Sequence, residues 1–402
     1  MTSNKAIPSR MSPYLCLKNW TIVFILLAIY AFQPALNAAQ DLPCRDNIGP
    51  SDALMITAPD GQTLYKKNET VKCIPASTLK ILTALAAIHH IGLSYRFRTE
   101  FYVDSDRNLK IKGYGDPLLT SEVWQEIADA LAHKIRKINN LILDVSFFSQ
   151  NIRIPGVEKS TNPYDAPVGA LCANFNTVWF DRDQKGGVIS AEPQTPMTPF
   201  AREKISLLGF KRGRYTFTHD QKEAAHYAGD LFLHFLNERG VKMNGEIRLG
   251  ALNGEIRLGA LGSDDKLIYA YLSKFTLEEV LKKTMEFSNN FIANQIFISL
   301  GAHVYGQPAT LKKGVRVVCD YSKNELHLKD FEIVEGSGIS RKNRISAKDM
   351  ITVLDRFKPY RHLLKKSGKT LIKTGTLDGI RTRAVYVEGS PGRTFYYVLF
   401  LN

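Results

Sequence analysis

The sequence lacks several features on which common classes of protein depend. Its 402 residues contain only five cysteines and nine histidines, and neither set shows the spacing of a zinc or other metal site. A hydrophobic content of 44% is too high for a disordered chain, and nothing in the composition indicates a coiled coil. Acidic residues are scarce relative to basic ones, 39 against 53. These absences leave a globular chain of two or more domains with no predicted metal.

A long apolar run is also missing from the start of the chain. Trp20–Phe32 is a thirteen-residue apolar segment, whereas a membrane-spanning helix needs roughly 20 residues. Basic residues precede this segment and small residues follow it, which is typical of a secretory signal peptide cut after residue 38 or 39. We therefore expect residues 1–39 to be a signal peptide and the protein to be exported to the periplasm or cell envelope. An uncleaved anchor is the alternative.

The exported chain is basic. Removal of residues 1–38 takes away three cations and no anions, and lowers the formal net charge from +14 to +11. Such a protein is attracted to anionic polymers such as the cell wall or lipid head groups, although the same lysines can simply solvate the surface. The strongest basic clusters are residues 356–369 and 211–214. A peripheral association with membrane or wall is compatible with this charge, and nucleic acid is not an expected partner.

Four cysteines remain after the predicted cleavage. Cys44, Cys73, Cys172 and Cys319 allow three complete pairings. The sequence does not choose between these pairings and free buried thiols.

Strand patterns lie at both ends of the remaining chain, with helical patterns between them. Residues 53–68 alternate around Pro59-Asp60-Gly61 and predict a β-hairpin. Helical patterns at 74–92, 276–287, 289–301 and 346–357 precede strand patterns at 370–377, 381–389 and 393–402. Short strands fill the segment between about 97 and 266, where a single helical stretch at 121–138 interrupts them. This order predicts an α/β (α+β) fold in which one domain, 40–96 and 267–402, is interrupted by a strand-rich insert, 97–266.

Nine residues occur twice in tandem. Asn244–Leu252 repeats without change as Asn253–Leu261. Two copies are too few for a solenoid, but Asn253-Gly254 between two alternating runs is a strong signal for a two-residue hairpin. We interpret the repeat as a duplication that lengthens one hairpin.

A serine and a lysine lie three residues apart where the 74–92 helix begins. Ser77 and Lys80 share one face of that helix. A serine hydroxyl needs an adjacent base to act as a nucleophile, and a lysine can serve if burial or a neighbouring cation keeps it neutral. The backbone N–H groups of the first turn can stabilise an oxyanion. Alone, Ser-x-x-Lys is a weak signal.

Two further motifs strengthen that signal. Ser288-x-Asn290 lies in a helical region, and Lys373-Thr374-Gly375-Thr376 lies on a predicted strand. We expect Ser288 to relay a proton between the lysine and the leaving amine, and Asn290 to hold Lys80 and a substrate amide. Lys373 would bind a terminal carboxylate and discourage a positive charge on Lys80. Gly375 would let the strand approach a bound peptide closely.

Ser-x-x-Lys, Ser-x-Asn and Lys-Thr-Gly in this order are the signature of penicillin-binding proteins and serine β-lactamases. Because 211 residues separate Ser77 from Ser288, the chain resembles the D-alanyl-D-alanine carboxypeptidase/endopeptidase family of low-molecular-mass penicillin-binding proteins that carry a large insert. The stretches PASTLK, GYGDPLL, YDAPVGAL, EGSGISRKNRISAKDM and KTGTLDGIRTRAVYV carry this resemblance.

The resemblance implies a transpeptidase-type fold, and an exported serine carboxypeptidase that is acylated on Ser77 by peptidoglycan stem peptides or by β-lactam antibiotics. It also implies deacylation by water, with no metal and no diffusible cofactor. The oxyanion would be bound by the backbone N–H groups of Ser77 and Thr376. Substrate binding would fall to Lys373, Thr374, Gly375 and Thr376.

The chain departs from that family in two places. Pro155-Gly156 is followed by Val157 and Glu158, where the family often has a tryptophan and an aspartate that holds a diamino-acid side chain, so endopeptidase action is a weaker expectation than carboxypeptidase action. The sequence stops at Asn402, directly after the last predicted strand, whereas relatives continue into a helix that covers the sheet. We therefore expect either a weaker fold or another segment that covers the sheet. A β-lactamase and a non-catalytic penicillin-sensing or wall-binding module remain the alternative functions.

Overall fold

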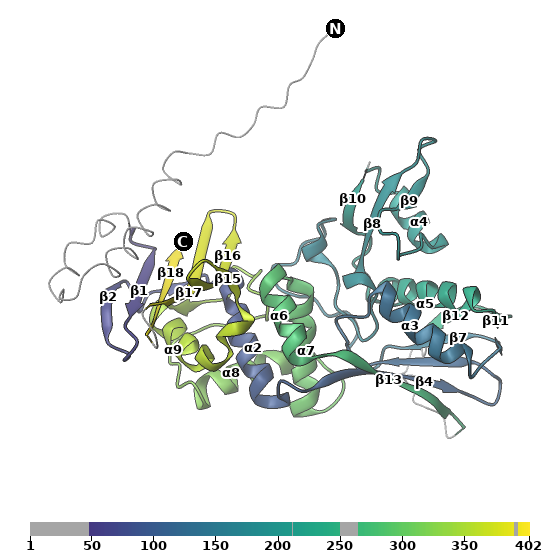
Figure 1. Cartoon of the computed structure of the whole chain (residues 1–402), viewed down its shortest axis with the longest axis horizontal. Helices are drawn as coiled ribbons and strands as arrows, with labels where there is room; N and C mark the ends of the chain where they lie inside the picture. Colours follow the sequence, from purple (N-terminus) through teal and green to yellow (C-terminus); the bar gives the residue numbers. More distant parts are fainter. Residues whose placement is uncertain (1–47, 211, 250–263, 390–392) are drawn as a thin grey trace, which may run out of the picture.

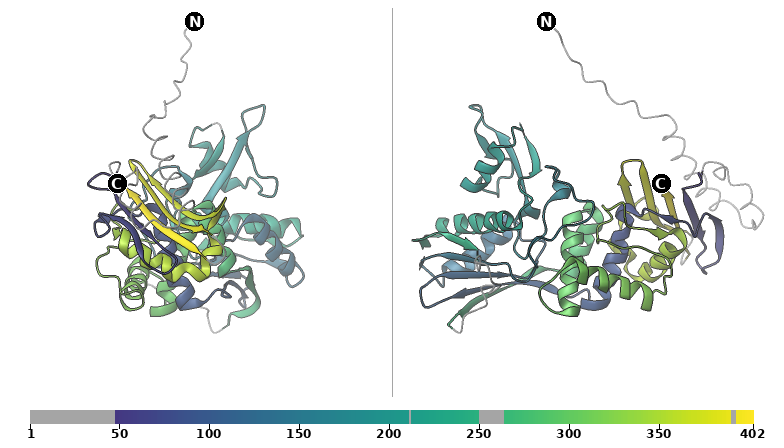
Figure 2. Two further views of the ribbon diagram at one scale, coloured as in Figure 1. Left: turned by 60° about the vertical axis from the view of Figure 1, so that its left-hand side comes forward. Right: turned by 180° about the vertical axis from the view of Figure 1, so that it is seen from behind.

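The computed structural model describes residues 48–210, 212–249, 264–389 and 393–402. Figure 1 shows an elongated molecule with two lobes. One lobe contains the strands from both ends of the chain, drawn in purple and yellow, and the other contains the teal segment between them. Figure 2 shows the same two lobes from the side and from behind.

The first lobe is built on a six-stranded antiparallel sheet in the order β15–β16–β17–β18–β1–β2. The β1–β2 pair confirms the predicted hairpin, and Gly61 takes the left-handed φ of 88° that this turn requires. The strands are β1 (Ala53–Thr57), β2 (Thr63–Lys67), β15 (Lys365–Ser367), β16 (Thr370–Leu377), β17 (Ile380–Glu388) and β18 (Thr394–Leu401). A separate two-stranded antiparallel sheet pairs β3 (Lys72–Cys73) with β14 (Ile345–Ser346).

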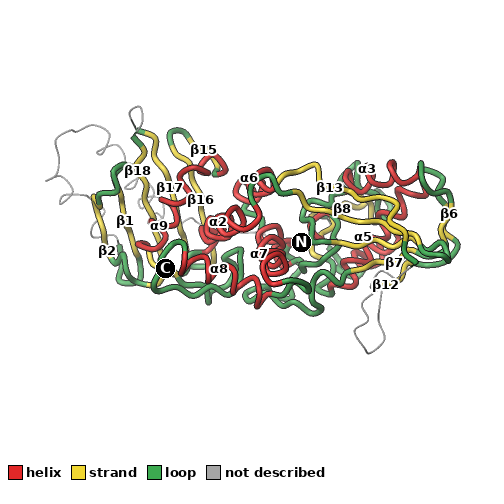
Figure 3. Tube along the Cα trace, turned by 90° about the horizontal axis from the view of Figure 1, so that it is seen from below, coloured by secondary structure: helices red, strands yellow, loops and turns green. Residues whose placement is uncertain are grey.

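Helices cover one face of this sheet. The central helix α2 contacts α6, α7, α8 and α9, while α9 packs on β1 and β18 (Figure 3). Every residue of α2 from Lys80 to Ala87 is buried, as expected for a helix surrounded by other helices. Gly92 ends it with φ 77°. The helices are η3 (Ala76–Leu79), α2 (Lys80–Ile91), α6 (Leu277–Phe287), α7 (Asn290–Tyr305), α8 (Leu311–Asn324), α9 (Ala347–Phe357) and η6 (Lys358–Leu363).

The second lobe contains a five-stranded mixed sheet in the order β12–β7–β5–β4–β13. Helices α3 (Ser121–Ala132) and α5 (Gln221–Glu238) pack together, and α5 also contacts β7 and β12. The strands of this sheet are β4 (Arg96–Val103), β5 (Leu109–Gly113), β7 (Leu141–Asp144), β12 (Ile247–Leu249) and β13 (Lys266–Thr276). Because β13 pairs with β4, this sheet continues past residue 266. The division into domains itself stays a prediction.

Smaller elements complete the second lobe. A three-stranded antiparallel sheet has the order β10–β8–β9, and helix α4 contacts β9. A short parallel pair joins β11 to β6. The elements are β6 (Lys137–Ile138), η4 (Pro163–Asp165), η5 (Asn174–Asn176), β8 (Thr177–Arg182), β9 (Val188–Ser190), α4 (Pro199–Ser206), β10 (Gly213–Thr216) and β11 (Lys242–Met243).

The prediction of a single helical stretch in the 97–266 segment is wrong. Besides α3, the described residues form α4 and the 18-residue helix α5. Asp220 caps α5 by accepting a hydrogen bond from the backbone N–H of Lys222. One side of α5, including Tyr227, Leu231 and Phe235, is buried, so packing on the five-stranded sheet stabilises a helix whose sequence pattern is weak.

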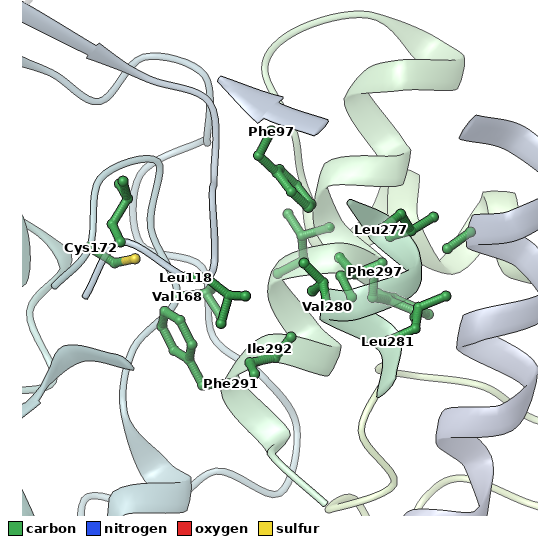
Figure 4. Packing of buried hydrophobic residues seen from close by; sticks show 14 of the residues in the cluster. Phe97, Leu118, Val168, Cys172, Leu277, Val280, Leu281, Phe291, Ile292 and Phe297 are labelled. Atoms are coloured by element: carbon green, nitrogen blue, oxygen red, sulfur yellow. The ribbon is translucent and has the colours of Figure 1, made fainter. Parts of the chain in front are cut away.

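The two lobes share one hydrophobic core. Leu118, Val168 and Cys172 from the second lobe belong to the same buried cluster as Leu277 and Phe297 from the first (Figure 4). A second, smaller cluster of buried residues lies on the other face of the six-stranded sheet and includes Leu54, Val385 and Leu399. The continuous core means that helices α6 and α7 are held by contacts on both sides.

Some predictions concern residues outside the described ranges. The signal peptide (1–39) and the proposed hairpin at Asn253-Gly254 both lie there. The described part of the first repeat copy forms β12, which pairs in parallel with β7. Cys73, Cys172 and Cys319 are free thiols in the structure. Within the described ranges, no helix combines the length and apolar character needed to cross a bilayer.

Candidate active site

Ser77 lies in a tight turn that leads into the central helix. The predicted 74–92 helix begins as the 3₁₀ turn η3 and continues as α2. Ala76, directly before the serine, is buried and has a left-handed φ of 46°, which is unusual for a residue with a side chain. The turn therefore presents a half-buried serine side chain above the start of α2.

Lys80 contacts Ser77 and is almost fully buried. Its Nζ lies 3.0 Å from Ser77 Oγ, 2.7 Å from Asn290 Oδ1 and 2.6 Å from the carbonyl oxygen of Ser337. Burial lowers the pKa of Lys80 well below its usual value, and the positive charge of Lys373 lowers this pKa further, against the opposing effect of Glu335. A neutral amine in this position can accept the hydroxyl proton of Ser77.

The Ser-x-Asn motif lies in the junction between α6 and α7. Ser288 ends α6 in the left-handed conformation, with φ 51°, and Asn290 is the first residue of α7. Asn289 caps α7 by accepting a hydrogen bond from the backbone N–H of Ile292 at 2.9 Å. In the described structure the hydrogen-bond partner of the Ser288 hydroxyl is Lys373, not Lys80. The predicted relay from Lys80 to Ser288 is therefore not visible as a direct bond.

Strand β16 places the Lys-Thr-Gly motif beside both serines. Lys373 Nζ donates to Ser288 Oγ at 2.8 Å and to the carbonyl oxygen of Thr374 at 2.7 Å. Burial lowers the pKa of Lys373 to about 8. The side chains of Thr374 and Thr376 are exposed, while Lys373 and Gly375 face inward, as the alternation of a strand requires.

The absence of a side chain at residue 375 lets β16 approach the nucleophile. A Cβ atom added to Gly375 would lie 2.3 Å from Thr382 Oγ1 and 2.7 Å from the backbone nitrogen of Ser77. Thr382 in turn donates a hydrogen bond to the carbonyl oxygen of Pro75 at 2.7 Å. The structure shows a close approach of Gly375 to the turn that carries Ser77. The predicted close approach to a bound peptide stays a prediction.

One edge of β16 is open next to Ser77. β17 pairs with β16 from residue 370 to 377, whereas β15 pairs with it only from 370 to 372. Among the described residues, no strand pairs with the other edge of residues 373–377, and an extended peptide can add there as a further strand.

The turn at residues 335–343 contributes to the site and was not predicted from the sequence. Glu335 is fully buried and accepts hydrogen bonds from the backbone N–H groups of Ser337 and Gly338, at 2.7 and 2.8 Å, and from the Asn343 side chain at 2.6 Å. These hydrogen bonds fix the position of the Ser337 carbonyl oxygen, which accepts a hydrogen bond from Lys80. Residues 335–350 resemble the family, but a backbone acceptor leaves no residue-type signal that could identify the Ser337 carbonyl oxygen.

A loop from the second lobe also reaches this turn. A Cβ atom added to Gly156 would lie 2.7 Å from the Cα atom of Ser340. Buried Asp165 accepts hydrogen bonds from the Glu158 backbone N–H at 3.2 Å and from Ser160 Oγ at 2.5 Å, and the Glu158 side chain is exposed. The segment that departs from the family pattern therefore lies beside the site.

No group of three or more His, Cys, Asp or Glu side chains in the described residues is placed to hold a metal ion. That the chemistry needs neither a metal nor a cofactor stays a prediction.

A serine in contact with a buried lysine of lowered pKa, beside an open strand edge, defines a candidate serine acyl-transfer site. The model of the D-Ala-D-Ala carboxypeptidase 3 (S13) family matches residues 46–208 and 190–363, and the chain belongs to this family. The predicted resemblance is confirmed. The Lys-Thr-Gly motif lies beyond the matched ranges.

Individual relatives agree with this assignment. The chain is 24% identical to the D-alanyl-D-alanine carboxypeptidase DacB of Haemophilus influenzae, over 90% of this chain and 87% of that protein. It is 23% identical to a D-alanyl-D-alanine carboxypeptidase of an Actinomadura species, over 87% of this chain and 77% of that protein.

A solved structure confirms the predicted fold class. Penicillin binding protein 4 (dacB) of Haemophilus influenzae has a similar fold, with a TM-score of 0.72, 21% identity, and coverage of 90% of this chain and 93% of that one. The penicillin-binding fold with its long segment between the first two motifs is therefore present in this chain.

Proposed function

We propose that this protein is an exported serine-type D-Ala-D-Ala carboxypeptidase that cleaves peptidoglycan stem peptides through an acyl-enzyme on Ser77. The observation that carries the proposal is the buried Lys80 amine 3.0 Å from Ser77 Oγ, beside the open edge of β16. Family membership supports the D-Ala-D-Ala carboxypeptidase activity, and the predicted signal peptide supports export to the periplasm or cell envelope.

Acylation follows from the geometry. A stem peptide adds to residues 373–377, with its terminal carboxylate on the Lys373 ammonium. The neutral Lys80 amine takes the Ser77 hydroxyl proton as Ser77 Oγ attacks the carbonyl carbon of the penultimate D-alanine. The oxyanion accepts hydrogen bonds from the backbone N–H groups of Ser77 and Thr376. The C–N bond then breaks, and the leaving D-alanine nitrogen takes the proton that Lys80 received. Ser288 is the proposed relay for this transfer, and in the described structure its hydroxyl accepts a hydrogen bond from Lys373.

Deacylation uses the same base. Water gives a proton to Lys80 and attacks the ester carbonyl carbon, and Ser77 Oγ leaves and regains its proton. Asn290 and the Ser337 carbonyl oxygen hold the Lys80 amine throughout, because each bonds Nζ at less than 3 Å. A β-lactam presents an equivalent carbonyl and carboxylate, and a β-lactam complex is known for the similar penicillin binding protein 4. We therefore expect β-lactam antibiotics to acylate Ser77.

The experiment is to incubate the purified mature protein with penicillin, weigh it by mass spectrometry, and then assay D-alanine release from a synthetic stem pentapeptide. We expect a stable penicilloyl adduct and catalytic release of D-alanine. Rapid penicillin hydrolysis instead of a stable adduct would indicate a β-lactamase. An adduct without D-alanine release would indicate a penicillin-sensing or wall-binding module, and would overturn the proposal.

A further inference from the structure

The small three-stranded sheet of the second lobe has one buried and one exposed face. Figure 1 shows this sheet, β10–β8–β9, above helix α5. Val178, Phe180 and Val188 are buried and belong to the main hydrophobic core. Because alternate residues of a strand point to opposite faces, the residues between them point outward, and Trp179 and Ile189 are 45% and 40% exposed. The outer face therefore presents large apolar side chains that the fold itself does not cover.

The strand register gathers polar side chains around Trp179. Arg214 pairs with Trp179 across β10 and β8, and its guanidinium carbon lies 5.2 Å from the centre of the indole ring. Arg214 also contacts the Glu192 carboxylate at 2.5 Å. Asp181 follows Trp179 on the same face and pairs with Ile189. An exposed indole ring is thus bordered by a guanidinium group and two carboxylates.

This set of groups favours a sugar over the other polymers of a cell envelope. The C–H face of a pyranose ring is flat and apolar, so its packing on an indole ring removes apolar surface from water. Sugar hydroxyl and amide groups both donate and accept hydrogen bonds, and they find acceptors in carboxylates and donors in a guanidinium group. Glu192 and Asp181 offset Arg214 and the exposed Arg212 that precedes β10. The face therefore lacks the excess positive charge that a polyanionic surface would require.

The small sheet is hydrogen-bonded to the loop that borders the active site. Strand β10 ends at Thr216, whose backbone N–H donates to the carbonyl oxygen of Thr161 at 2.9 Å. Thr161 belongs to the 155–165 loop, and Gly156 of that loop lies against the turn at residues 335–343. A polymer bound on the outer face of the sheet is therefore held by a segment that continues to the site.

From this arrangement we propose that the outer face of the β10–β8–β9 sheet binds the glycan strand of peptidoglycan, with one pyranose ring stacked on Trp179 and its polar groups bonded by Arg214 and Asp181. The inference rests on the proposed function and deepens it. An extended stem pentapeptide spans at most about 18 Å, so the glycan that carries it runs close to the site and can continue to the sheet. A glycan-linked stem peptide is then a better substrate than a free one, because two parts of one molecule bind together.

The first test uses the fluorescence of Trp179 in the unchanged protein. The sequence has three tryptophans, of which Trp20 lies in the predicted signal peptide and Trp124 is fully buried. Acrylamide quenching of the mature protein therefore reports on Trp179. We expect oligomers of β-1,4-linked N-acetylglucosamine to lower the quenching constant by about half, because a stacked ring covers one face of the indole. No protection by the sugar would overturn the proposal, and so would protection by phosphatidylglycerol vesicles alone.

The second test compares D-alanine release from a free stem pentapeptide and from the same peptide on a glycan strand. We expect the wild type to have the higher kcat/KM for the glycan-linked peptide. Trp179→Ala should reduce the ratio of the two kcat/KM values roughly tenfold, or about 1.4 kcal/mol, through KM. Leu207→Ala is the matched control, since this residue at the end of α4 is 79% exposed and should leave the ratio at its wild-type value.

The outcomes separate the two proposals. A ratio in Trp179→Ala equal to that of the wild type would overturn the glycan surface. Absence of D-alanine release by a wild type whose Trp179 is protected by the sugar would instead refute the proposed function and support the glycan surface.

Discussion

At the scale of single residues, two lysines in one site have opposite protonation requirements. Lys80 must be neutral to accept the Ser77 proton, whereas Lys373 must be charged to bind a carboxylate. Burial lowers the pKa of both, and the positive charge of Lys373 lowers the pKa of Lys80 further. The site therefore uses one cation to keep its neighbour neutral.

This balance predicts a bell-shaped pH dependence of kcat/KM for a stem peptide with a free terminal carboxylate. Activity should fall toward acidic pH as Lys80 gains a proton. It should fall again as the pH rises through about 8, because Lys373 then loses the charge that binds the carboxylate. Stopped-flow acylation across pH measures both limbs. If kcat/KM for a C-terminally amidated peptide fell over the same alkaline range, this limb would arise from a group other than Lys373.

Substitution of Lys373 tests its role directly. Lys373→Ala should raise the activation free energy of acylation, by penicillin and by the stem peptide, by about 2–5 kcal/mol. This is the effect expected when one member of a desolvated charge pair is removed. The acylation rate of a C-terminally amidated stem peptide should fall far less. Acylation rates of the three substrates in wild type and variant provide the measurement. Equal losses would point instead to an effect on Lys80 or on folding.

The functional side chains could be predicted from the sequence because their spacing reflects their chemistry. Ser77 and Lys80 lie three residues apart on one turn, and the structure brings them together. Ser337 could not be predicted, because it acts through a backbone carbonyl that any residue possesses. Glu335 was missed for a related reason: its carboxylate bonds the next turn of its own chain.

At the scale of elements, the packing of β16 on η3 positions the nucleophile. Gly375→Ala should lower the rate of penicillin acylation about 100-fold, because an added Cβ would force β16 away from Ser77, and a displacement near 1 Å can have that effect. Gly389→Ala is the control, since the nearest described atom to its added Cβ, outside its chain neighbours, is the Arg393 carbonyl oxygen at 3.3 Å. Comparable losses in the two variants would contradict this role of Gly375.

The sequence predicted the longer strands of the six-stranded sheet and the central helix better than helices α5 and α8. The strands at 370–377, 381–389 and 393–402 have clear alternation or continuous apolar runs, and all three form. Helix α5 mixes alanines with aromatic residues over 18 positions, and helix α8 received no prediction. Both depend on tertiary packing that a local pattern does not report.

At the scale of the whole molecule, the long segment between the first two motifs is not a detached appendage. Its residues share a core with α6 and α7, and its 155–165 loop packs beside the turn that contacts Lys80. This continuity was not predictable from the sequence, because it depends on contacts between residues far apart in the chain.

The nine-residue repeat provides a test of which residues of this segment contribute to stability and to acylation. Deletion of Asn253–Leu261 should leave penicillin acylation and the melting temperature nearly unchanged, because the remaining copy still supplies β12. Differential scanning calorimetry and the acylation rate measure both effects. Ile247→Asp within β12 is the contrasting variant and should lower the melting temperature, because this residue packs against the core. A large loss of melting temperature on deletion would show that the second copy is also packed.

The most direct test of the central claim is to map the penicilloyl adduct by peptide mass spectrometry in the wild type, Ser77→Ala and Lys80→Arg. The account predicts one adduct, on Ser77, that disappears in Ser77→Ala without loss of the fold. Lys80→Arg should be nearly as inactive, since a guanidinium stays protonated and cannot accept the hydroxyl proton. A stable adduct on another residue in Ser77→Ala, or acylation of Lys80→Arg at the wild-type rate, would contradict the account.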